Sequence, residues 1–224
     1  MPTIIAREGY PIIAAALAAS LLLLGAAFLT GGRATLVLGV LAACALLFAV
    51  FSLYFFRDPE RHADHGPQAV ISPADGTIID IREVDEDRYM HARATRISIF
   101  MSVFNVHVNR APVSGTIEHM HYNPGKFMSA FKEKASIDNE QLLVGLQREG
   151  CETKIAVSFI AGLIARRIVF YKKLRDRIAR GERINMIRFG SRVDLYLPAG
   201  ARIVAAAGDR VKAGETLLAE LTSR

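Results

Sequence analysis

The sequence has no tryptophan and only two cysteines among its 224 residues. Cys44 lies in a long uncharged run, and Cys151 follows a glycine in a polar stretch. Cysteines placed so differently predict neither a disulfide framework nor a cysteine-based metal site, and they agree with a reducing compartment. The chain also lacks sustained heptads and any nucleotide-binding signature, which disfavours a coiled coil and a nucleotide-dependent enzyme.

Charge is absent from two long stretches near the N-terminus, residues 11–30 and 34–56, which residues 31–33 separate. At about 1.5 Å of rise per helical residue, each stretch can cross the roughly 30 Å hydrocarbon core of a bilayer. A cleaved signal peptide would explain one short apolar stretch but not two long ones. We therefore expect residues 1–56 to form a transmembrane helical hairpin. A buried soluble hairpin is the alternative, and it would need a partner surface around helices that are apolar on nearly every face.

A hairpin places both of its ends on the same side of the membrane. Arg57 and Arg61 follow the second apolar stretch, whereas only Arg33 marks the turn. The positive-inside tendency then predicts that residues 57–224 face the cytoplasm at the cell membrane. The chain has 28 Lys and Arg against 22 Asp and Glu, a balance that suits anionic phospholipid. Nucleic acid is not predicted as a partner, because no aromatic and basic RNA-binding motif accompanies the charge.

Beyond residue 57 the sequence consists of short runs rich in β-branched residues, with glycine between them. This pattern predicts a mainly β domain. The segment 73–78 (PADGTI) is echoed by 112–117 (PVSGTI), and 176–184 is echoed by 209–217. Such paired units resemble the hammerhead of biotinyl and lipoyl carrier domains. We therefore expect a hammerhead-like β-sandwich with pseudo-symmetric halves, preceded by the two-helix hairpin.

Five motifs beyond the hairpin occur in an order that is specific for one enzyme family. They are FRDP at 56–59, SPADG at 72–76, NVHVNRAP at 105–112, YNPG at 122–125 and RFGSRVD at 188–194. Each motif is weak alone, but together they resemble the phosphatidylserine decarboxylases of the short bacterial and archaeal type. The resemblance implies a catalytic domain at 57–224 that converts phosphatidylserine in the membrane leaflet to phosphatidylethanolamine. It also implies a pyruvoyl cofactor that the enzyme makes from one of its own serines.

The cleavage site that the resemblance implies is the bond between Gly190 and Ser191. Attack of the serine hydroxyl on the preceding carbonyl gives an ester, and elimination followed by hydrolysis leaves a pyruvoyl group at residue 191. Glycine removes a Cβ that would hinder attack, and it permits a strained backbone. The products are fragments 1–190 and 191–224, which form a heterodimer, with a homo-oligomer of these left open. The ketone then forms a Schiff base with the substrate amine and withdraws electrons as carbon dioxide leaves.

Two further catalytic residues are expected from the motifs. The resemblance places His107 in the active site, where protonation of the carbanion requires a group that titrates near neutrality. Asp75 is the candidate for orienting this base or for activating Ser191. Longer bacterial and mitochondrial enzymes carry a second histidine where this chain has Arg110. Because a guanidinium stays protonated, Arg110 cannot act as a base, and we predict that it binds the substrate carboxylate or phosphate.

Other interpretations stay open at the level of the sequence. His119 and His121 alternate along an expected strand, but no third ligand has recognisable spacing, and no metal is predicted. The basic segment 166–183 is either a solvated face or a surface for lipid headgroups. A carrier-type or membrane-fusion protein would share the domain pattern, although no lysine stands at a carrier-like hairpin tip. A serine–lysine peptidase would combine Ser191 with Lys172 or Lys173.

Overall fold

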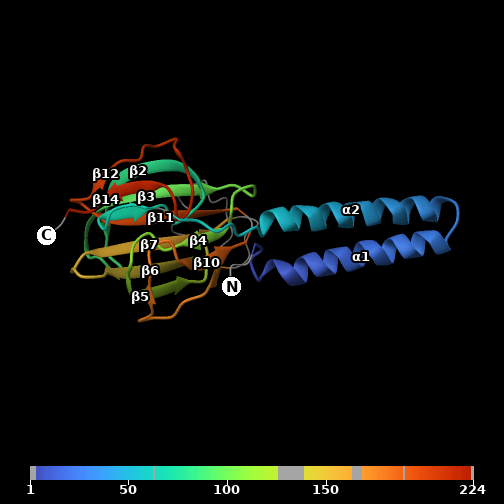
Figure 1. Ribbon diagram of the computed structural model, residues 1–224, viewed down its shortest axis with the longest axis horizontal. Coiled ribbons are helices and arrows are strands. Elements are labelled where there is room, and N and C mark those ends of the chain that lie inside the picture. Colours follow the sequence, from blue (N-terminus) through green and yellow to red (C-terminus); the bar gives the residue numbers. More distant parts are fainter. Residues whose placement is uncertain (1–3, 63, 126–138, 163–167, 189, 223–224) are drawn as a thin grey trace. The chain divides into compact units, whose positions relative to one another are not determined.

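The computed structural model describes residues 4–62, 64–125, 139–162, 168–188 and 190–222 (Figure 1). The chain divides into two compact units, residues 1–60 and 61–224. The first unit is helical and the second is mainly β, as the sequence predicts.

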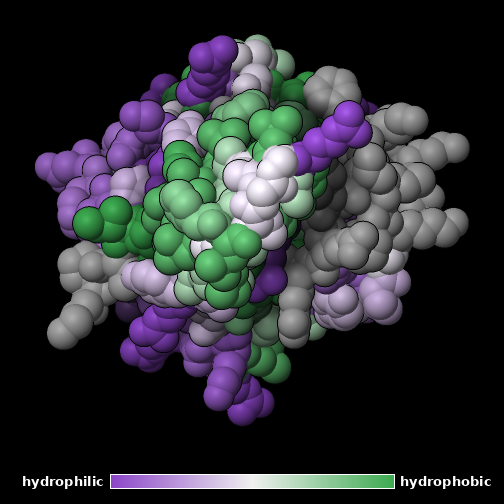
Figure 2. Space-filling view, turned by 90° about the vertical axis from the view of Figure 1, so that its right-hand side faces the viewer, coloured by the Kyte–Doolittle hydropathy of each residue, from purple (hydrophilic) through white to green (hydrophobic). Residues whose placement is uncertain are grey.

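The first unit is a hairpin of two helices, α1 (Gly9–Leu29) and α2 (Arg33–Phe55), each long and apolar enough to cross a membrane. The helices approach through small side chains, and the Ser20 hydroxyl donates to the carbonyl of Ala42 at 2.9 Å. Most of the larger apolar side chains are exposed instead, as the green surface of the hairpin in Figure 2 shows. A helix pair with so much exposed apolar surface requires an apolar environment, which supports membrane association.

The strands of the second unit form three sheets in the described residues. An eight-stranded sheet of order β13-β2-β3-β11-β7-β6-β5-β9 curls into a half-barrel (Figure 1), and two smaller sheets have the orders β1-β14-β12 and β4-β10-β8. The strands are β1 (Ala69–Ile71), β2 (Gly76–Glu86), β3 (Ala92–Met101), β4 (Val108–Arg110), β5 (Gly115–Asn123), β6 (Gln141–Arg148), β7 (Lys154–Ala161), β8 (Ile168–Phe170), β9 (Arg177–Ile178), β10 (Arg183–Ile187), β11 (Ser191–Pro198), β12 (Arg202–Ile203), β13 (Arg210–Val211) and β14 (Leu217–Glu220).

The predicted pseudo-symmetry is confirmed strand by strand. Gly76 at the start of β2 pairs with Val211 of β13, and Gly115 at the start of β5 pairs with Ile178 of β9. Both β2 and β5 then carry a bulge at the same distance from the glycine. The repeat relates β1, β2, β3, β11, β12, β13 and β14 to β4, β5, β6, β7, β8, β9 and β10 respectively. The segments that resemble each other in sequence are therefore equivalent in structure.

One half of the domain is inserted into the other. The chain forms β1 to β3, passes into the second half from β4 to β10, and returns to complete the first half with β11 to β14. The chain thus crosses between the halves twice, once after β3 and once before β11. The two crossings lie side by side, because Ser191 at the start of β11 pairs with Met101 at the end of β3. In addition, the Ile187 N–H donates to the His107 carbonyl at 3.3 Å. Two motifs that are more than 80 residues apart thus meet where the halves join.

Candidate active site

Ser191 lies in the interior of the second unit. It begins β11 and sits between Met101 of β3 and Ala161 of β7. The residue is fully buried, and its hydroxyl donates to the sulfur of Met101 at 3.3 Å. Residues directly opposite each other in an antiparallel pair share a face of the sheet, and both neighbours belong to the hydrophobic core. The Ser191 side chain therefore points into the core between the sheets, away from bulk water.

Gly190 adopts a backbone conformation that glycine favours. Its φ is +61°, in the left-handed region where a Cβ is strained whatever the surrounding space. Any residue other than glycine at position 190 would therefore strain the backbone directly before the Gly190–Ser191 bond. Self-processing at the Gly190–Ser191 bond stays a prediction.

A buried ion pair holds the strand directly after Ser191. Arg192 bonds both carboxylate oxygens of Asp194 at 2.6 and 2.7 Å, and the two side chains are 3% and 0% exposed. Burial lowers the pKa of Arg192, but the hydrogen bonds and charge of Asp194, together with the charges of Tyr196 and Asp80, give a net rise of that pKa. The Arg192 guanidinium thus stays charged beside Asp194 on the face of β11 opposite Ser191, where the pair fixes the position of the strand.

His107 is fully buried at the end of the first crossing. The turn before it is stabilised by Asn105, whose side-chain oxygen accepts hydrogen bonds at 2.8 Å from both the N–H and the hydroxyl of Ser102. Nδ1 of His107 lies 2.9 Å from the carbonyl oxygen of Asn105. Because a carbonyl only accepts, Nδ1 carries the proton, and the lone pair of the neutral ring is on Nε2. The backbone thus selects a tautomer in which Nε2 is the basic nitrogen.

His107 and Ser191 face the same interior from different sheets. The hydrogen bond from the Ile187 N–H to the His107 carbonyl continues the β4–β10 register by one residue beyond Val108 and Met186, so we infer that the His107 and Ile187 side chains share one face of the strand pair. Ile187 belongs to the same core as Met101, the neighbour of Ser191. The structure therefore directs both predicted residues into one interior at the junction of the halves.

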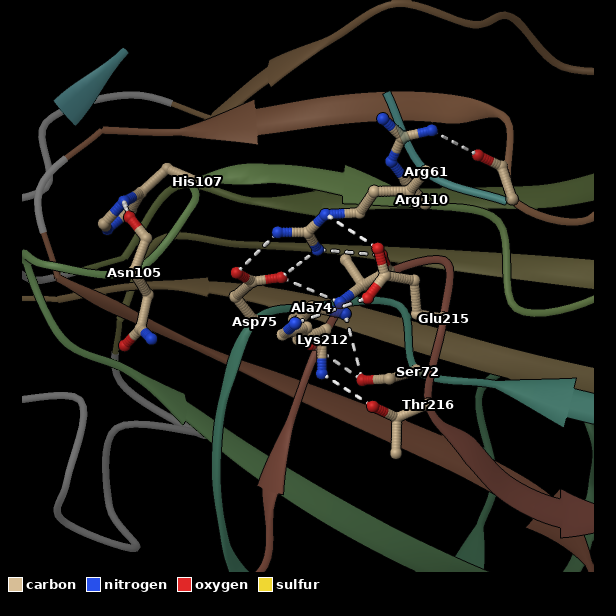
Figure 3. A network of polar contacts seen from close by, with 12 residues as sticks. Arg61, Ser72, Ala74, Asp75, Asn105, His107, Arg110, Lys212, Glu215 and Thr216 are labelled. Carbon is tan, nitrogen blue, oxygen red and sulfur yellow. Dashed lines mark hydrogen bonds and ion pairs between the residues drawn. The ribbon is translucent and has the colours of Figure 1, made fainter. Parts of the chain in front are cut away.

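Asp75 is held by an ion pair with Arg61 (Figure 3). Nη2 of Arg61 donates to Oδ2 at 2.9 Å, Nη1 bonds Oδ1, and the Ala213 N–H donates to Oδ1 at 2.8 Å. In Figure 3 the His107 ring lies away from this carboxylate, and the described contacts of Asp75 do not include Ser191. Activation of Ser191 by Asp75 remains a prediction. Sequence reasoning did not pair Arg61 with Asp75, because Arg61 lies in the linker after the hairpin.

The Arg61–Asp75 pair leads to a prediction about stability. Both side chains are at most 10% exposed, so Asp75→Ala removes the two direct bonds of a buried guanidinium to this carboxylate and leaves it the more distant Glu215 carboxylate, at 3.8 Å. We expect the free energy of unfolding to fall by about 3–5 kcal/mol. Denaturant unfolding of the purified protein measures this change, and Arg61→Met combined with Asp75→Ala should restore part of the loss. Asp75→Ala with wild-type stability would contradict the structural role.

Arg110 is also buried and already bonded. Its Nη1 donates to the carbonyl of Gly181 at 2.9 Å, and only 4% of the residue is exposed. Because it follows Asn109 on β4, its side chain projects from the face opposite to that of His107. A Cβ on Gly214 would lie 2.6 Å from Cδ of Arg110, so this glycine leaves room for the arginine. Binding of the substrate by Arg110 remains a prediction.

The other residues considered from the sequence lie elsewhere. The rings of His119 and His121 stack at 6.4 Å between centroids, and in the described part of the chain no group of three His, Cys, Asp or Glu is placed to hold a metal ion. Lys172 forms an ion pair with Glu182, and the described hydrogen bond of Ser191 is to Met101. No described contact supports a serine–lysine pair.

Known proteins match the chain over nearly its whole length. The family described as phosphatidylserine decarboxylase matches residues 48–219. The phosphatidylserine decarboxylase proenzyme of Desulfotalea psychrophila is 46% identical over 217 residues, which cover 97% of this chain and 96% of that protein. Proenzymes of the same name from Symbiobacterium thermophilum and Aromatoleum aromaticum are 43% and 46% identical over 218 and 219 residues, with the same coverage. The chain therefore belongs to the phosphatidylserine decarboxylase family, as its five motifs predict.

Proposed function

We propose that this chain decarboxylates phosphatidylserine to phosphatidylethanolamine, with a pyruvoyl group that it makes from Ser191 by cutting the Gly190–Ser191 bond. The observation that carries the proposal is the position of Ser191, which is fully buried, follows a glycine of positive φ and shares an interior with His107. The name proenzyme, which the relatives carry, supports processing of the chain.

The proposed cut is an N-to-O acyl shift. Oγ of Ser191 attacks the carbonyl carbon of Gly190, the C–N bond breaks, and an ester joins the two residues. Loss of the Cα proton of residue 191 then expels the Gly190 carboxylate and leaves dehydroalanine. Uptake of water and release of ammonia convert residue 191 to the pyruvoyl group. A base is needed for the first and second steps, and the Nε2 lone pair of His107 suits that role.

The residues around position 191 fit a polar group of this kind. Three fully buried polar side chains, those of His107, Asn109 and Asn185, belong to the interior that Ser191 enters. The pyruvoyl ketone supplies the electron sink for loss of carbon dioxide. His107 holds the proton that must reach the substrate carbon afterwards, and burial of the site keeps water from competing with it. The Arg192–Asp194 pair keeps residue 191 in place after the cut.

The large fragment should be an integral membrane component. In the proposal, α1 and α2 span the cell membrane and the catalytic unit faces the cytoplasm, where the lipid headgroup is reached from the leaflet. We expect fragment 1–190 to stay with membranes through high-salt and carbonate washing. Fragment 191–224 should stay with it, because β11 is hydrogen-bonded to both β3 and β7.

Fractionation with detection of both fragments tests this expectation. A peripheral membrane protein in the same preparation is the control, and it should be released by carbonate. Release of fragment 1–190 into the soluble fraction would contradict the spanning hairpin.

A further inference from the structure

Two buried asparagines near His107 have unused hydrogen-bonding capacity. Asn109 of β4 and Asn185 of β10 lie directly opposite each other, and both are fully buried. The amide nitrogen and oxygen of each side chain lack a hydrogen-bond partner among the described residues. Nearly all buried polar groups in folded proteins have a partner, and an unsatisfied one is costly. Four such atoms in one place therefore require an explanation.

The asparagine pair belongs to the candidate active site. Asn185 precedes Ile187 by two residues, so both side chains lie on the same face of β10. Ile187 faces the core and lies opposite His107, and Asn185 lies opposite Asn109. All four side chains are thus on one face of the β4–β10 pair. This is the face that meets the interior into which Ser191 points.

The pseudo-symmetric half shows that the fold does not need these asparagines. By strand register, the positions equivalent to Asn109 and Asn185 are Val70 of β1 and Ala219 of β14, which also lie opposite each other. One more residue separates Ala219 from Gly214 than separates Asn185 from Gly181, so the register and not the sequence offset gives this equivalence. Val70 and Ala219 are fully buried members of the hydrophobic core. In the half that contains β1 and β14, apolar side chains therefore pack at the two positions that the asparagines occupy in β4 and β10. In the half that carries His107, two amides occupy those positions at a cost in stability.

We infer that Asn109 and Asn185 bind the serine carboxylate of the phospholipid beside residue 191, an inference that rests on the proposed function. Their Nδ2 groups donate hydrogen bonds, and the carboxylate oxygens accept them. The carboxylate loses its charge during the reaction, so a buried cation would stabilise the substrate more than the transition state. Neutral amides orient the group with a smaller penalty. The asparagine pair thus suits a carboxylate that must leave as carbon dioxide.

The residues of the other half provide the test variant, Asn109→Val combined with Asn185→Ala. This variant should fold, melt at or above the wild-type temperature and split at residue 191. The reason is that its new side chains, valine and alanine, already pack at the equivalent positions of the other half. We expect kcat/KM for phosphatidylserine, per pyruvoyl group trapped with borohydride and an amine, to fall about 10²-fold or more. Inhibition by phosphatidylethanolamine, which lacks the carboxylate, should be unchanged.

Ser98→Ala is the matched control. Ser98 is also fully buried, and its hydroxyl has no hydrogen-bond partner within the described part of the chain. It lies between two core residues of β3, so it points to the opposite face of the sheet. We expect its kcat/KM to stay within about twofold of wild type. Should the double variant fail to fold, Asn109→Val and Asn185→Ala alone answer the same question, each with a loss of about tenfold.

The outcomes separate the inference from the proposed function. Wild-type kcat/KM in the asparagine variant, or an equal loss of affinity for phosphatidylserine and phosphatidylethanolamine, overturns the inference alone. A lower melting temperature with unchanged turnover also overturns it, since buried water would then satisfy the amides. Wild-type protein that yields neither a trapped pyruvoyl group nor carbon dioxide overturns both.

Discussion

Ser191→Ala will leave the protein as one uncut chain that releases no measurable carbon dioxide from phosphatidylserine. The substitution removes the oxygen that attacks the Gly190 carbonyl and the side chain from which the pyruvoyl group is made. Its structural cost should be small, because the lost hydrogen bond is a single contact with a methionine sulfur. A denaturing gel and a carbon dioxide assay on the same preparation measure both effects.

Ser158→Ala is the control for this substitution. Ser158 is a fully buried serine of the adjacent strand β7, and its hydroxyl donates to Gln141 at 3.2 Å. It lies between two core residues, so it points away from the interior that Ser191 enters. This variant should split and turn over like wild type. Splitting or decarboxylation by Ser191→Ala would show that another residue provides the cofactor.

His107→Ala will slow decarboxylation by about 10²- to 10⁴-fold, the usual contribution of a general acid–base group. Self-cleavage occurs once in the lifetime of the protein, whereas a proton must reach the substrate carbon at every turnover. Part of the population should therefore still split during hours of incubation, even with a poor base. Fragment formation and carbon dioxide release are followed separately, and the rate is expressed per trapped pyruvoyl group.

His62→Ala is the control for His107, because His62 is an exposed residue of the linker after the hairpin. It should split and turn over normally. If His107→Ala decarboxylates at the wild-type rate per trapped pyruvoyl group, His107 has only a structural role. Tyr122 and His121 would then be the next proton donors to test.

The architecture explains how a chain can be cut in its interior without coming apart. In the half that contains β6 and β7, these strands are joined by a short loop, closed by a hydrogen bond from the Arg148 N–H to the Thr153 carbonyl at 3.0 Å. In the other half, the equivalent strands β3 and β11 are separated by the whole inserted half. The proposed cut before Ser191 would therefore fall in a connection between the two halves and not within a strand. Hydrogen bonds on both sides of β11 would retain the small fragment.

The features predicted from the sequence are those that local patterns encode. Two uncharged stretches longer than a bilayer core predict the helices, and repeated glycines at tight turns predict the pseudo-symmetric halves. The motifs that identify the family are short and contiguous. Asp75 and His107 were named from such motifs, but a motif carries no information about which distant side chain will contact them.

Contacts between distant segments could not be predicted in the same way. The Arg61–Asp75 pair joins the linker to a turn, and the curl of the large sheet depends on how all of its strands pack. The role inferred for Asn109 appears only when the strand registers are compared. A signal was nevertheless present, since the offset between PADGTI and PVSGTI aligns Asn109 with Val70.

The intact mass of the purified protein shows directly whether the chain is cut before Ser191. Self-cleavage should give two polypeptides, residues 1–190 and 191–224, with the smaller one starting at a pyruvoyl group in place of Ser191. Its N-terminus should lack a free amine, and borohydride with an amine should add mass to this fragment alone. A single uncut chain of 24.5 kDa that decarboxylates phosphatidylserine at full rate would contradict the account.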